Sequence, residues 1–321
     1  MLGSWGASPK PVTSQRKTQV TSQTFPWRGF PTRYQACGAT GPAVVCIHGF
    51  GASSDHWRKN LPILGQTCQV YALDLIGFGG SAKPKPSEEL DYTFETWGQQ
   101  VVDFCQTVVG RPAVLVGNSI GAVVALQAAV VAPDWVKGVG LLNCSLRLLH
   151  QRRRASLPWY RRWGAPLLQN LLGYHPLGHQ FFRQVAQPQV ITRILRQAYG
   201  DPATVTQELV EAIYRPAVDP GAADVFLAFV RYDSGPLPED LLPKVTCPVW
   251  IAWGTADPWE PLNMGQQLAE YPAVQDFRPL EGVGHCPQDE APDQVNALLL
   301  TWLQAVDQDN QNGGHNSYQQ V

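Results

Sequence analysis

Short apolar runs that alternate with helical patterns constrain this chain most strongly. Each of the five runs is rich in β-branched and other apolar side chains: residues 43–47, 69–73, 113–116, 136–142 and 248–253. Strands buried on both faces have this pattern, because neither face meets water. Segments in which apolar residues recur at helical intervals lie between these runs or after them: residues 93–109, 120–132, 262–270 and 291–306. Strands that alternate with helices predict an α/β fold with a mainly parallel sheet.

The alternation divides the chain into a core, an insertion and two tails. Residues 145–235 are helical in pattern, broken by prolines and without convincing strands. We interpret them as a helical cap inserted into a core formed by residues 25–144 and 236–306. Residues 1–24 are rich in Ser, Thr, Gln and Pro and contain no acidic residue, which favours a disordered tail over a transit peptide. Residues 307–321 are polar and predict a second disordered tail.

The composition excludes three classes of protein. The chain has 321 residues, of which 44% are hydrophobic and 16% charged, and this is not the composition of a disordered protein. Its net charge of −2 lacks the basic excess of a general nucleic-acid binder. No run of about 18 or more apolar residues occurs, so no segment is expected to span a membrane. The seven cysteines are scattered and include no C-x-x-C pair, which predicts buried thiols in a reducing compartment rather than disulfides.

The near-neutral total hides a charge asymmetry along the chain. Residues 1–144 carry a net charge of +3, residues 145–235 one of +5, and residues 236–321 one of −10. All eleven basic residues of the middle segment are arginines. In residues 150–163 arginines alternate with aromatic side chains, which is typical of a solvated helix face and also of a surface that rests on anionic lipid. We favour the solvated face, and the other interpretation predicts peripheral membrane contact through the Arg-rich cap.

The sequence G-N-S-I-G at residues 117–121 predicts a nucleophile. It follows the apolar run 113–116 and opens the helical pattern 120–132, which is the strand–turn–helix context that gives G-x-S-x-G its meaning. The glycines let neighbouring elements approach the sharp turn, and the turn lifts the Ser119 hydroxyl clear of the sheet. The start of the following helix favours the negative charge that develops in acyl transfer.

Acyl transfer also needs two N–H donors for the carbonyl oxygen, which form an oxyanion hole. One is predicted from the backbone of Ile120, the residue after the nucleophile. The other is predicted from Phe50, which follows His48 and Gly49 in a glycine-rich loop after residues 43–47. We interpret His48 as a residue that fixes this loop rather than as the catalytic base.

An acid and a base complete the predicted catalytic triad. Asp257 follows the run 248–253, and His285 lies in a glycine-rich loop before the last helix. His285 can accept the proton of Ser119, and Asp257 can hold the imidazole in the right tautomer and stabilise its charged form. This chemistry requires no cofactor and no metal.

Other residues offer alternatives for these roles. Glu260 is the alternative acid, and another histidine is the alternative base. His175 and His179 have the spacing of two metal ligands on a helix, but the proline between them and the lack of a third ligand argue against a metal site. Cys286, beside His285, fits packing better than a second nucleophile.

Taken together, these residues resemble the α/β-hydrolase family over about residues 25–306. The order Ser, Asp, His along the chain is that of the family, and residues 74–81 are similar to its D-x-x-G-x-G-x-S loop. The resemblance implies a doubly wound sheet with a helical cap inserted after the sixth strand. Ser119 separates the chain from dehalogenases and epoxide hydrolases, which use aspartate there, and Ile120 separates it from cofactor-free perhydrolases, which have methionine.

A narrower resemblance is to the pheophytinase and chlorophyll-dephytylase group, in residues 219–229, 234–239, 257–261 and 284–290. Ala122 stands where that group usually has a second glycine, a departure expected to affect packing more than chemistry. The group hydrolyses the phytyl ester of chlorophyll-type pigments in plants and cyanobacteria. The resemblance therefore implies a carboxylic-ester hydrolase for a bulky hydrophobic ester, in the cytoplasm or a plastid stroma-like compartment, peripheral to the thylakoid membrane.

Two other functions stay open at this point. One is a carbon–carbon bond hydrolase or acyltransferase that uses the same triad. The other is a non-catalytic receptor on the same fold, which would be expected to have a damaged triad, whereas every position here is filled. If the protein is an ester hydrolase, its expected partner is a hydrophobic small molecule and not a nucleic acid.

Overall fold

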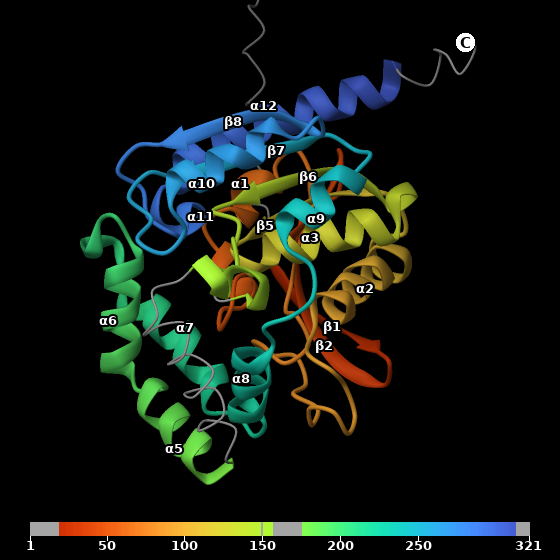
Figure 1. Cartoon of the computed structure of the whole chain (residues 1–321). Coiled ribbons are helices and arrows are strands. Elements are labelled where there is room, and N and C mark those ends of the chain that lie inside the picture. The colour runs from red at the N-terminus through yellow and green to blue at the C-terminus, as the bar shows by residue number, and fades with distance from the viewer. Residues whose placement is uncertain (1–18, 149, 157–174, 313–321) are drawn as a thin grey trace, which may run out of the picture.

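A mostly parallel sheet forms the centre of the computed structural model, which describes residues 19–148, 150–156 and 175–312 (Figure 1). Within these residues the sheet has eight strands in the order β1-β2-β4-β3-β5-β6-β7-β8. β2 pairs antiparallel with both β1 and β4, and the other neighbours run parallel. The strands are Thr21–Trp27 (β1), Phe30–Cys37 (β2), Ala43–Ile47 (β3), Gln69–Leu73 (β4), Ala113–Asn118 (β5), Val136–Leu142 (β6), Val249–Gly254 (β7) and Val274–Leu280 (β8).

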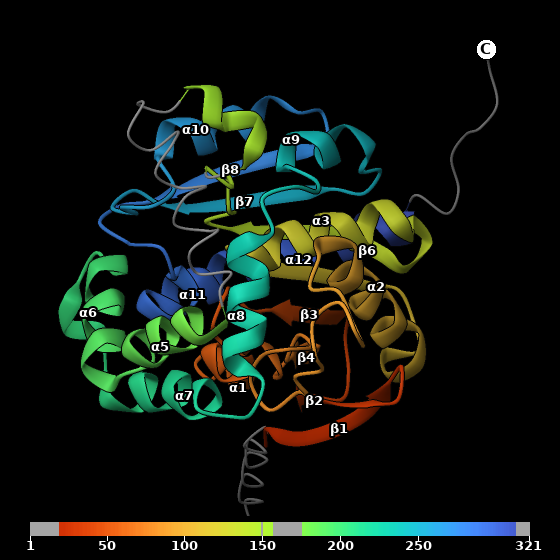
Figure 2. The same cartoon turned by 60° about the horizontal axis from the view of Figure 1, so that its bottom comes forward.

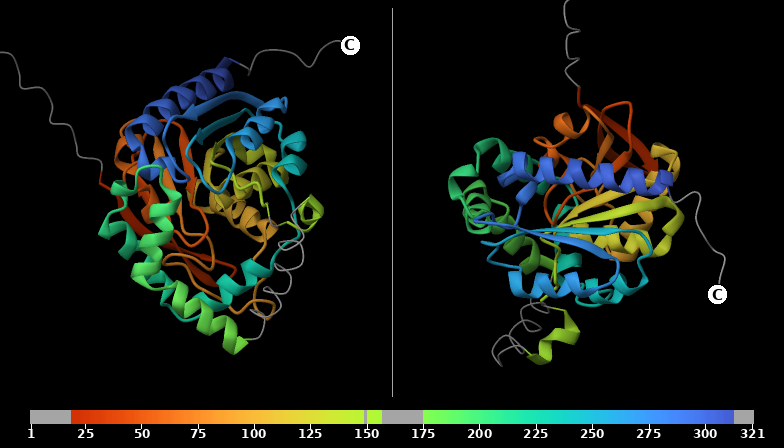
Figure 3. Two further views of the ribbon diagram at one scale, coloured as in Figure 1. Left: turned by 60° about the vertical axis from the view of Figure 1, so that its left-hand side comes forward. Right: turned by 90° about the horizontal axis from the view of Figure 1, so that it is seen from above.

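The central strands are buried on both faces. In β3, Val45 and Ile47 enter one hydrophobic core while Val44 and Cys46 enter a second core on the opposite face, because successive side chains of a strand point in opposite directions. Helices cover each core, so the sheet is doubly wound (Figure 3). They are Phe94–Phe104 (α2) and Ile120–Val131 (α3) over the first core, and Leu61–Leu64 (α1) and Pro292–Asn312 (α12) over the second.

Helices also fill the described part of the segment between β6 and β7, which there contains no strand. We call α5–α8 the cap helices; they gather on the side toward which the parallel strands point (Figure 2). They are His175–Val185 (α5), Pro188–Ala198 (α6), Gln207–Ala217 (α7) and Ala222–Arg231 (α8). The shorter helices used below are Ser54–Trp57 (η1), Pro238–Leu241 (α9), Leu262–Gln267 (α10) and Pro287–Glu290 (α11).

Both predicted tail boundaries are wrong. The last residues of the predicted tail 1–24 belong to β1, which pairs with β2 from Thr21 onward. The first four residues of β1 are polar and exposed, and Phe25 and Trp27 alone are buried in it, so its apolar pattern is too short to detect. The helix α12 runs past the predicted end of the core at residue 306 into polar sequence, as far as Asn312. Residues 1–18 and 313–321 of the predicted tails, and residues 157–163 of the Arg-rich segment, lie outside the described residues.

The strands that sequence reasoning predicted are the buried ones, and all five are confirmed as β3 to β7. β8 escaped prediction because most of its side chains are exposed or half-buried. β1 and β8 form the two edges of the sheet. All seven cysteines are free, and each is buried except Cys247, which is half-buried.

A buried carboxylate organises the loop that follows β4. Both oxygens of Asp74 accept backbone hydrogen bonds, Oδ1 from Ser54 N at 2.6 Å and Oδ2 from Gly80 N at 2.7 Å. Arg33 Nη1 lies 3.3 Å from Oδ2, and the Asp74 side chain has no exposed area. One side chain thereby joins β2, η1 and residues 74–81, the segment that resembles the family's D-x-x-G-x-G-x-S loop.

We expect Asp74→Ala to lower the free energy of unfolding by about 3–5 kcal/mol, because it leaves the backbone N–H groups of Ser54 and Gly80 without their acceptor. Arg33 keeps its ion pair with Asp55, at 2.8 Å. Urea unfolding followed by circular dichroism measures this loss. Glu88→Ala is the control, since Glu88 pairs with Lys85 where both side chains are largely exposed, and it should change stability by less than about 0.5 kcal/mol. Equal effects of the two substitutions would contradict this account of the loop.

Candidate active site

The turn between β5 and α3 holds Ser119 in a strained backbone conformation. Its φ of 56° and ψ of −120° are unusual for a residue with a side chain and cost on the order of 1–3 kcal/mol. Neighbouring backbone leaves no room for larger residues on either side. A Cβ atom on Gly117 would lie 2.2 Å from Gly121 O, and one on Gly121 would lie 2.4 Å from Ile47 O. The sequence G-x-S-x-G is thus explained by close packing of β3, β5 and α3 around the serine.

The predicted acid and base lie together at the ends of neighbouring strands. His285 Nδ1 donates a hydrogen bond to Asp257 Oδ2 at 2.7 Å, and the two side chains are 7% and 1% exposed. Burial alone would raise the pKa of Asp257, but hydrogen bonds and charge from His285, with further hydrogen bonds, outweigh it and lower that pKa. Asp257 is therefore an ionised carboxylate, which suits its predicted role of holding the imidazole.

Sequence reasoning missed Asn143, which holds the acid from the other side. Asn143 Nδ2 donates to Asp257 Oδ2 at 2.7 Å, and its Oδ1 accepts from Gly254 N at 2.9 Å. Asn143 directly follows β6 and has a φ of 40°. The available signal was its position at the end of a predicted strand, where polar side chains of parallel sheets meet.

The loop after β3 lies against Ser119, the predicted nucleophile. A Cβ atom on Gly49 would be 3.2 Å from Ser119 Cβ. Phe50 and Ile120, the predicted donors of the oxyanion hole, line the same cavity as Ser119. His48 is fully buried. Its Nδ1 donates a hydrogen bond to Gly49 O at 2.7 Å, and its Nε2 accepts one from Leu75 N, in the loop after β4, at 3.0 Å. Burial lowers the pKa of His48, so a neutral histidine fixes this loop.

The alternative residues have other contacts. Glu260 accepts hydrogen bonds from Ser145 Oγ and from Leu146 N, each at 3.1 Å, rather than from the predicted base. His179 pairs with Asp224 at 2.7 Å, and no cluster of three or more metal-ligating residues occurs in the part of the chain that the structure describes. Burial raises the pKa of Cys286 well above its ordinary value, which suppresses the thiolate that a nucleophile needs.

A cavity of about 420 Å³ joins the candidate catalytic residues to the cap helices. Ser119 and His285 line its core side, together with His56, Trp259 and Glu260. No hydrogen bond links the Ser119 hydroxyl to His285 among the described contacts, and such catalytic bonds often tighten when a ligand binds. The cap side is apolar and comprises Phe182, Val185, Ala186, Ile191, Ile194, Leu195, Ala198, Ile213, Ala217 and Phe226.

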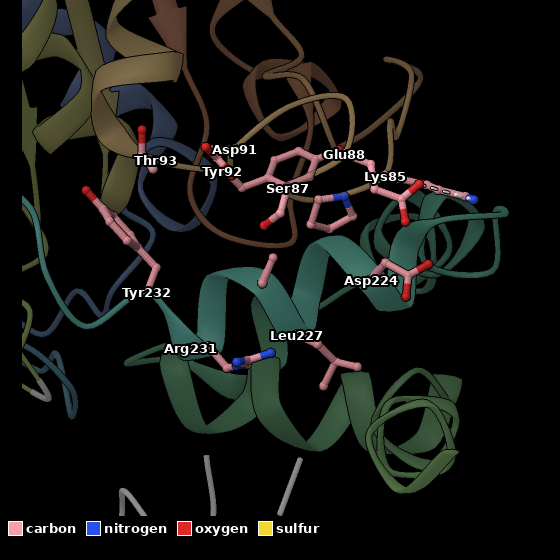
Figure 4. A pocket seen from close by; sticks show the side chains of 12 residues that line it. Lys85, Ser87, Glu88, Asp91, Tyr92, Thr93, Asp224, Leu227, Arg231 and Tyr232 are labelled. Carbon is pink, nitrogen blue, oxygen red and sulfur yellow. Dashed lines mark ion pairs between the residues drawn. The ribbon is translucent and has the colours of Figure 1, made fainter. Parts of the chain in front are cut away.

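A larger hollow of about 590 Å³ lies elsewhere, between residues 85–93 and α8 (Figure 4). Figure 4 shows Lys85, Glu88 and Asp91 from the loop opposite Asp224 and Arg231 from the helix. No predicted site residue lines it. Its size reflects an open surface of mixed charge, so the smaller apolar cavity is the one associated with Ser119.

Comparison with known proteins agrees with this geometry. Residues 44–298 match the alpha/beta hydrolase family. The chain is 26% identical over 300 residues to chloroplastic pheophytinase of Arabidopsis thaliana, an alignment that covers 83% of this chain and 62% of that protein. It is 27% identical over 262 residues to the uncharacterised hydrolase YugF of Bacillus subtilis, with 81% and 89% covered.

Among solved structures, a membrane phospholipase A described as a bacterial virulence factor superposes with a TM-score of 0.71 at 23% identity. The superposition covers 90% of this chain and 87% of the phospholipase. At this identity the likeness concerns the fold. Because the family match extends over most of the chain, the resemblance drawn from the sequence is confirmed, and the protein belongs to the alpha/beta hydrolase family.

Proposed function

We propose that this protein is a serine carboxylic-ester hydrolase for a bulky hydrophobic ester, namely the phytyl ester of a chlorophyll-type pigment. The observation that carries the proposal is the strained Ser119 at the wall of an apolar cavity that His285 also lines. Similarity to chloroplastic pheophytinase supports the pigment substrate.

In the proposed reaction, Ser119 Oγ attacks the ester carbonyl carbon while His285 Nε2 accepts the hydroxyl proton. The backbone amides of Phe50 and Ile120 stabilise the negative oxygen. His285 then returns the proton to the leaving alcohol, which departs and leaves an acyl-enzyme. Water attacks that acyl group with His285 as base, and the acid and free Ser119 are released.

The cavity suits an alkyl chain better than a tetrapyrrole ring. At about 420 Å³, it holds roughly fourteen groups of methylene size if each takes the ~30 Å³ share of a water molecule. Its cap side offers no charged side chain among the described residues that line it. The cavity therefore accommodates about fourteen of the roughly twenty carbons of a phytyl chain. The rest of the chain and the pigment ring would remain outside it.

Ser119→Ala is expected to lower phytol release from pheophytin a or chlorophyll a by at least about 10³-fold, because it removes the nucleophile. Chromatography of the pigment products measures this, with p-nitrophenyl esters as simpler substrates. Ser87→Ala is the matched control, since Ser87 is another serine with positive φ, at 63°, and lies in the surface hollow away from the site.

Unchanged phytol release by Ser119→Ala would overturn the mechanism. Ester hydrolysis without pigment hydrolysis would overturn the pigment substrate alone. Products of carbon–carbon cleavage or acyl transfer would point to the alternative chemistry, and failure of Ser119 to react with a fluorophosphonate probe would favour the non-catalytic receptor.

The protonation of Glu260 affects the polarity of the cavity. Burial raises its pKa to about 7, although the charge of His285 and the hydrogen bonds from Leu146 and Ser145 act in the opposite direction. Near neutral pH, a large share of the molecules then holds this carboxyl uncharged. An uncharged cavity wall beside Ser119 favours the binding of an apolar substrate.

Glu260→Gln is expected to remove a pH-dependent loss of stability. The folded protein holds the Glu260 proton up to about pH 7, whereas an unfolded glutamate releases it near pH ~4.3. Wild-type stability should therefore fall as the pH rises from about 5 to 7, and the variant should gain roughly 3 kcal/mol relative to wild type between pH 5 and pH 8. Urea unfolding at several pH values tests this, and Glu270→Gln, at an exposed position, is the control. If the free energy of unfolding differed between Glu260→Gln and wild type by the same amount at every pH, the raised pKa of Glu260 would be contradicted.

We also propose that the cap touches anionic lipid, which would bring a membrane-dissolved ester to the cavity. Leu177 and Phe181 of α5 are 42% and 40% exposed. The cap helices also carry exposed arginines, Arg183 on α5 and Arg193 on α6. Such a surface can rest on a thylakoid-like membrane from the stromal or cytoplasmic side. No helix among the described residues has the length and apolarity to cross a membrane.

Vesicles containing anionic lipid should carry the protein in co-flotation at low salt and release most of it at about 1 M salt, where the Debye length is near 3 Å. Leu177→Ser with Phe181→Ser should weaken this binding. Neutral vesicles serve as the control. If the protein did not bind the vesicles, or if salt did not change the binding, the proposed lipid contact would be wrong and the arginines of the cap would simply face solvent.

A further inference from the structure

The backbone of His285 is held between the cap and the nucleophile turn. Its N–H donates to Ala198 O, at the end of α6, at 2.8 Å. Its carbonyl accepts from Asn118 Nδ2, one residue before the nucleophile, at 3.0 Å. The position of the imidazole therefore depends on a cap helix as well as on Asp257.

The loop that carries His285 also contacts the turn after α6 directly. A Cβ atom on Gly284 would lie 2.3 Å from Ala198 O, and one on Gly200 would lie 2.0 Å from Gly282 O. Glu290 bridges the two segments, with Oε2 accepting from Gly284 N at 2.8 Å and Oε1 from Asp201 N at 3.0 Å. Cap and loop thus meet backbone to backbone.

Tyr199, which directly follows α6, connects this contact to a buried series of hydrogen bonds. Its hydroxyl donates to Asp289 Oδ2 at 2.9 Å and accepts from His56 Nε2 at 3.1 Å. His56 Nδ1 then accepts from Gln288 Nε2 at 3.4 Å, and the same amide donates to Asn118 Oδ1 at 3.2 Å. The series runs from the cap to the side chain that precedes Ser119.

Charges fix the direction of these hydrogen bonds. Burial alone would raise the pKa of Asp289, but nearby positive charge, including that of Arg58 and Lys59, and the hydrogen bond from Tyr199 outweigh it and lower that pKa. Arg58 and Lys59 lie 2.8 and 3.2 Å from Asp289 Oδ1. An ionised carboxylate accepts hydrogen bonds and cannot donate them, so the Tyr199 hydroxyl must donate toward it.

The same helix end faces the ligand cavity. Leu195 and Ile191 of α6 line the cavity and also pack in one hydrophobic cluster with Tyr199 and Cys286, the residue after His285. An alkyl chain of a substrate that fills the cavity therefore contacts α6, the helix whose end holds the backbone of His285.

We propose that the end of α6 positions His285, with Tyr199 as the positioning residue that connects the cap to the base and to the nucleophile turn. The inference rests on the proposed function, because it concerns the alignment of that triad. Remote binding energy from a hydrophobic substrate would then be used to align the base, and this appears in kcat rather than in KM.

Tyr199→Phe is expected to lower kcat for p-nitrophenyl decanoate by about 10- to 100-fold while KM stays within about twofold, because loss of the hydroxyl lets the base shift. Tyr214→Phe is the matched control. Tyr214 is half-buried, lies on α7, packs in the same cluster and makes no hydrogen bond among the described contacts of its side chain. Thermal melting shows whether each variant is folded at the assay temperature.

Glu290→Gln provides a second, milder change, since it keeps one acceptor oxygen for Gly284 N or Asp201 N, and a loss in kcat of a few-fold is expected. A kcat within twofold of wild type for both Tyr199→Phe and Glu290→Gln would overturn the proposal, as would a loss confined to KM. Wild type is assayed and labelled with a fluorophosphonate in parallel. An inactive, unlabelled wild type overturns the proposed function, and an active one with unaffected variants overturns this inference alone.

Discussion

The close approach of α3 to β3 at Gly121 is the constraint on which the site depends. Gly121 brings the first turn of α3 against the carbonyl of Ile47, so that no side chain fits between them. Ser119 must then turn through a strained conformation to connect β5 with the helix. The loop at Gly49 continues from the same strand and therefore arrives beside the serine. One backbone contact thus positions both Ser119 and its neighbouring loop.

Sequence patterns predicted strands with continuous apolar runs and short motifs. They did not predict roles that depend on contacts between residues far apart in the sequence. β3 to β7 were predictable because burial on both faces leaves a continuous apolar run. The edge strands β1 and β8 were not, because one face meets water and their apolar residues are few. Motif and order were enough to predict that Asp257 and His285 lie together and that Ser119 and His285 line one cavity, while their catalytic roles stay a prediction. Asn143 and Tyr199 were not predictable, because their roles arise from contacts made across the sheet and across the cap.

The acidic excess of the last third of the chain has a structural location. Of its acidic residues, Asp257, Glu260, Asp289 and Glu290 gather around the loop of His285. Each has a different environment: Asp257 and Asp289 have lowered pKa values, whereas burial raises those of Glu260 and Glu290. A segment with a strongly negative total charge thereby supplies carboxyls with lowered and with raised pKa values within one small region.

The two edge strands also bear on how copies of this protein meet one another. Edge strands expose unpaired backbone groups, which invite strand addition by another molecule. β1 contains Pro26 and β8 contains Pro279, and each proline removes one N–H donor. On β8, the exposed pair of Asp276 and Arg278 adds charge beside that proline. The open sheet is therefore protected at both ends against the edge-to-edge growth that begins aggregation.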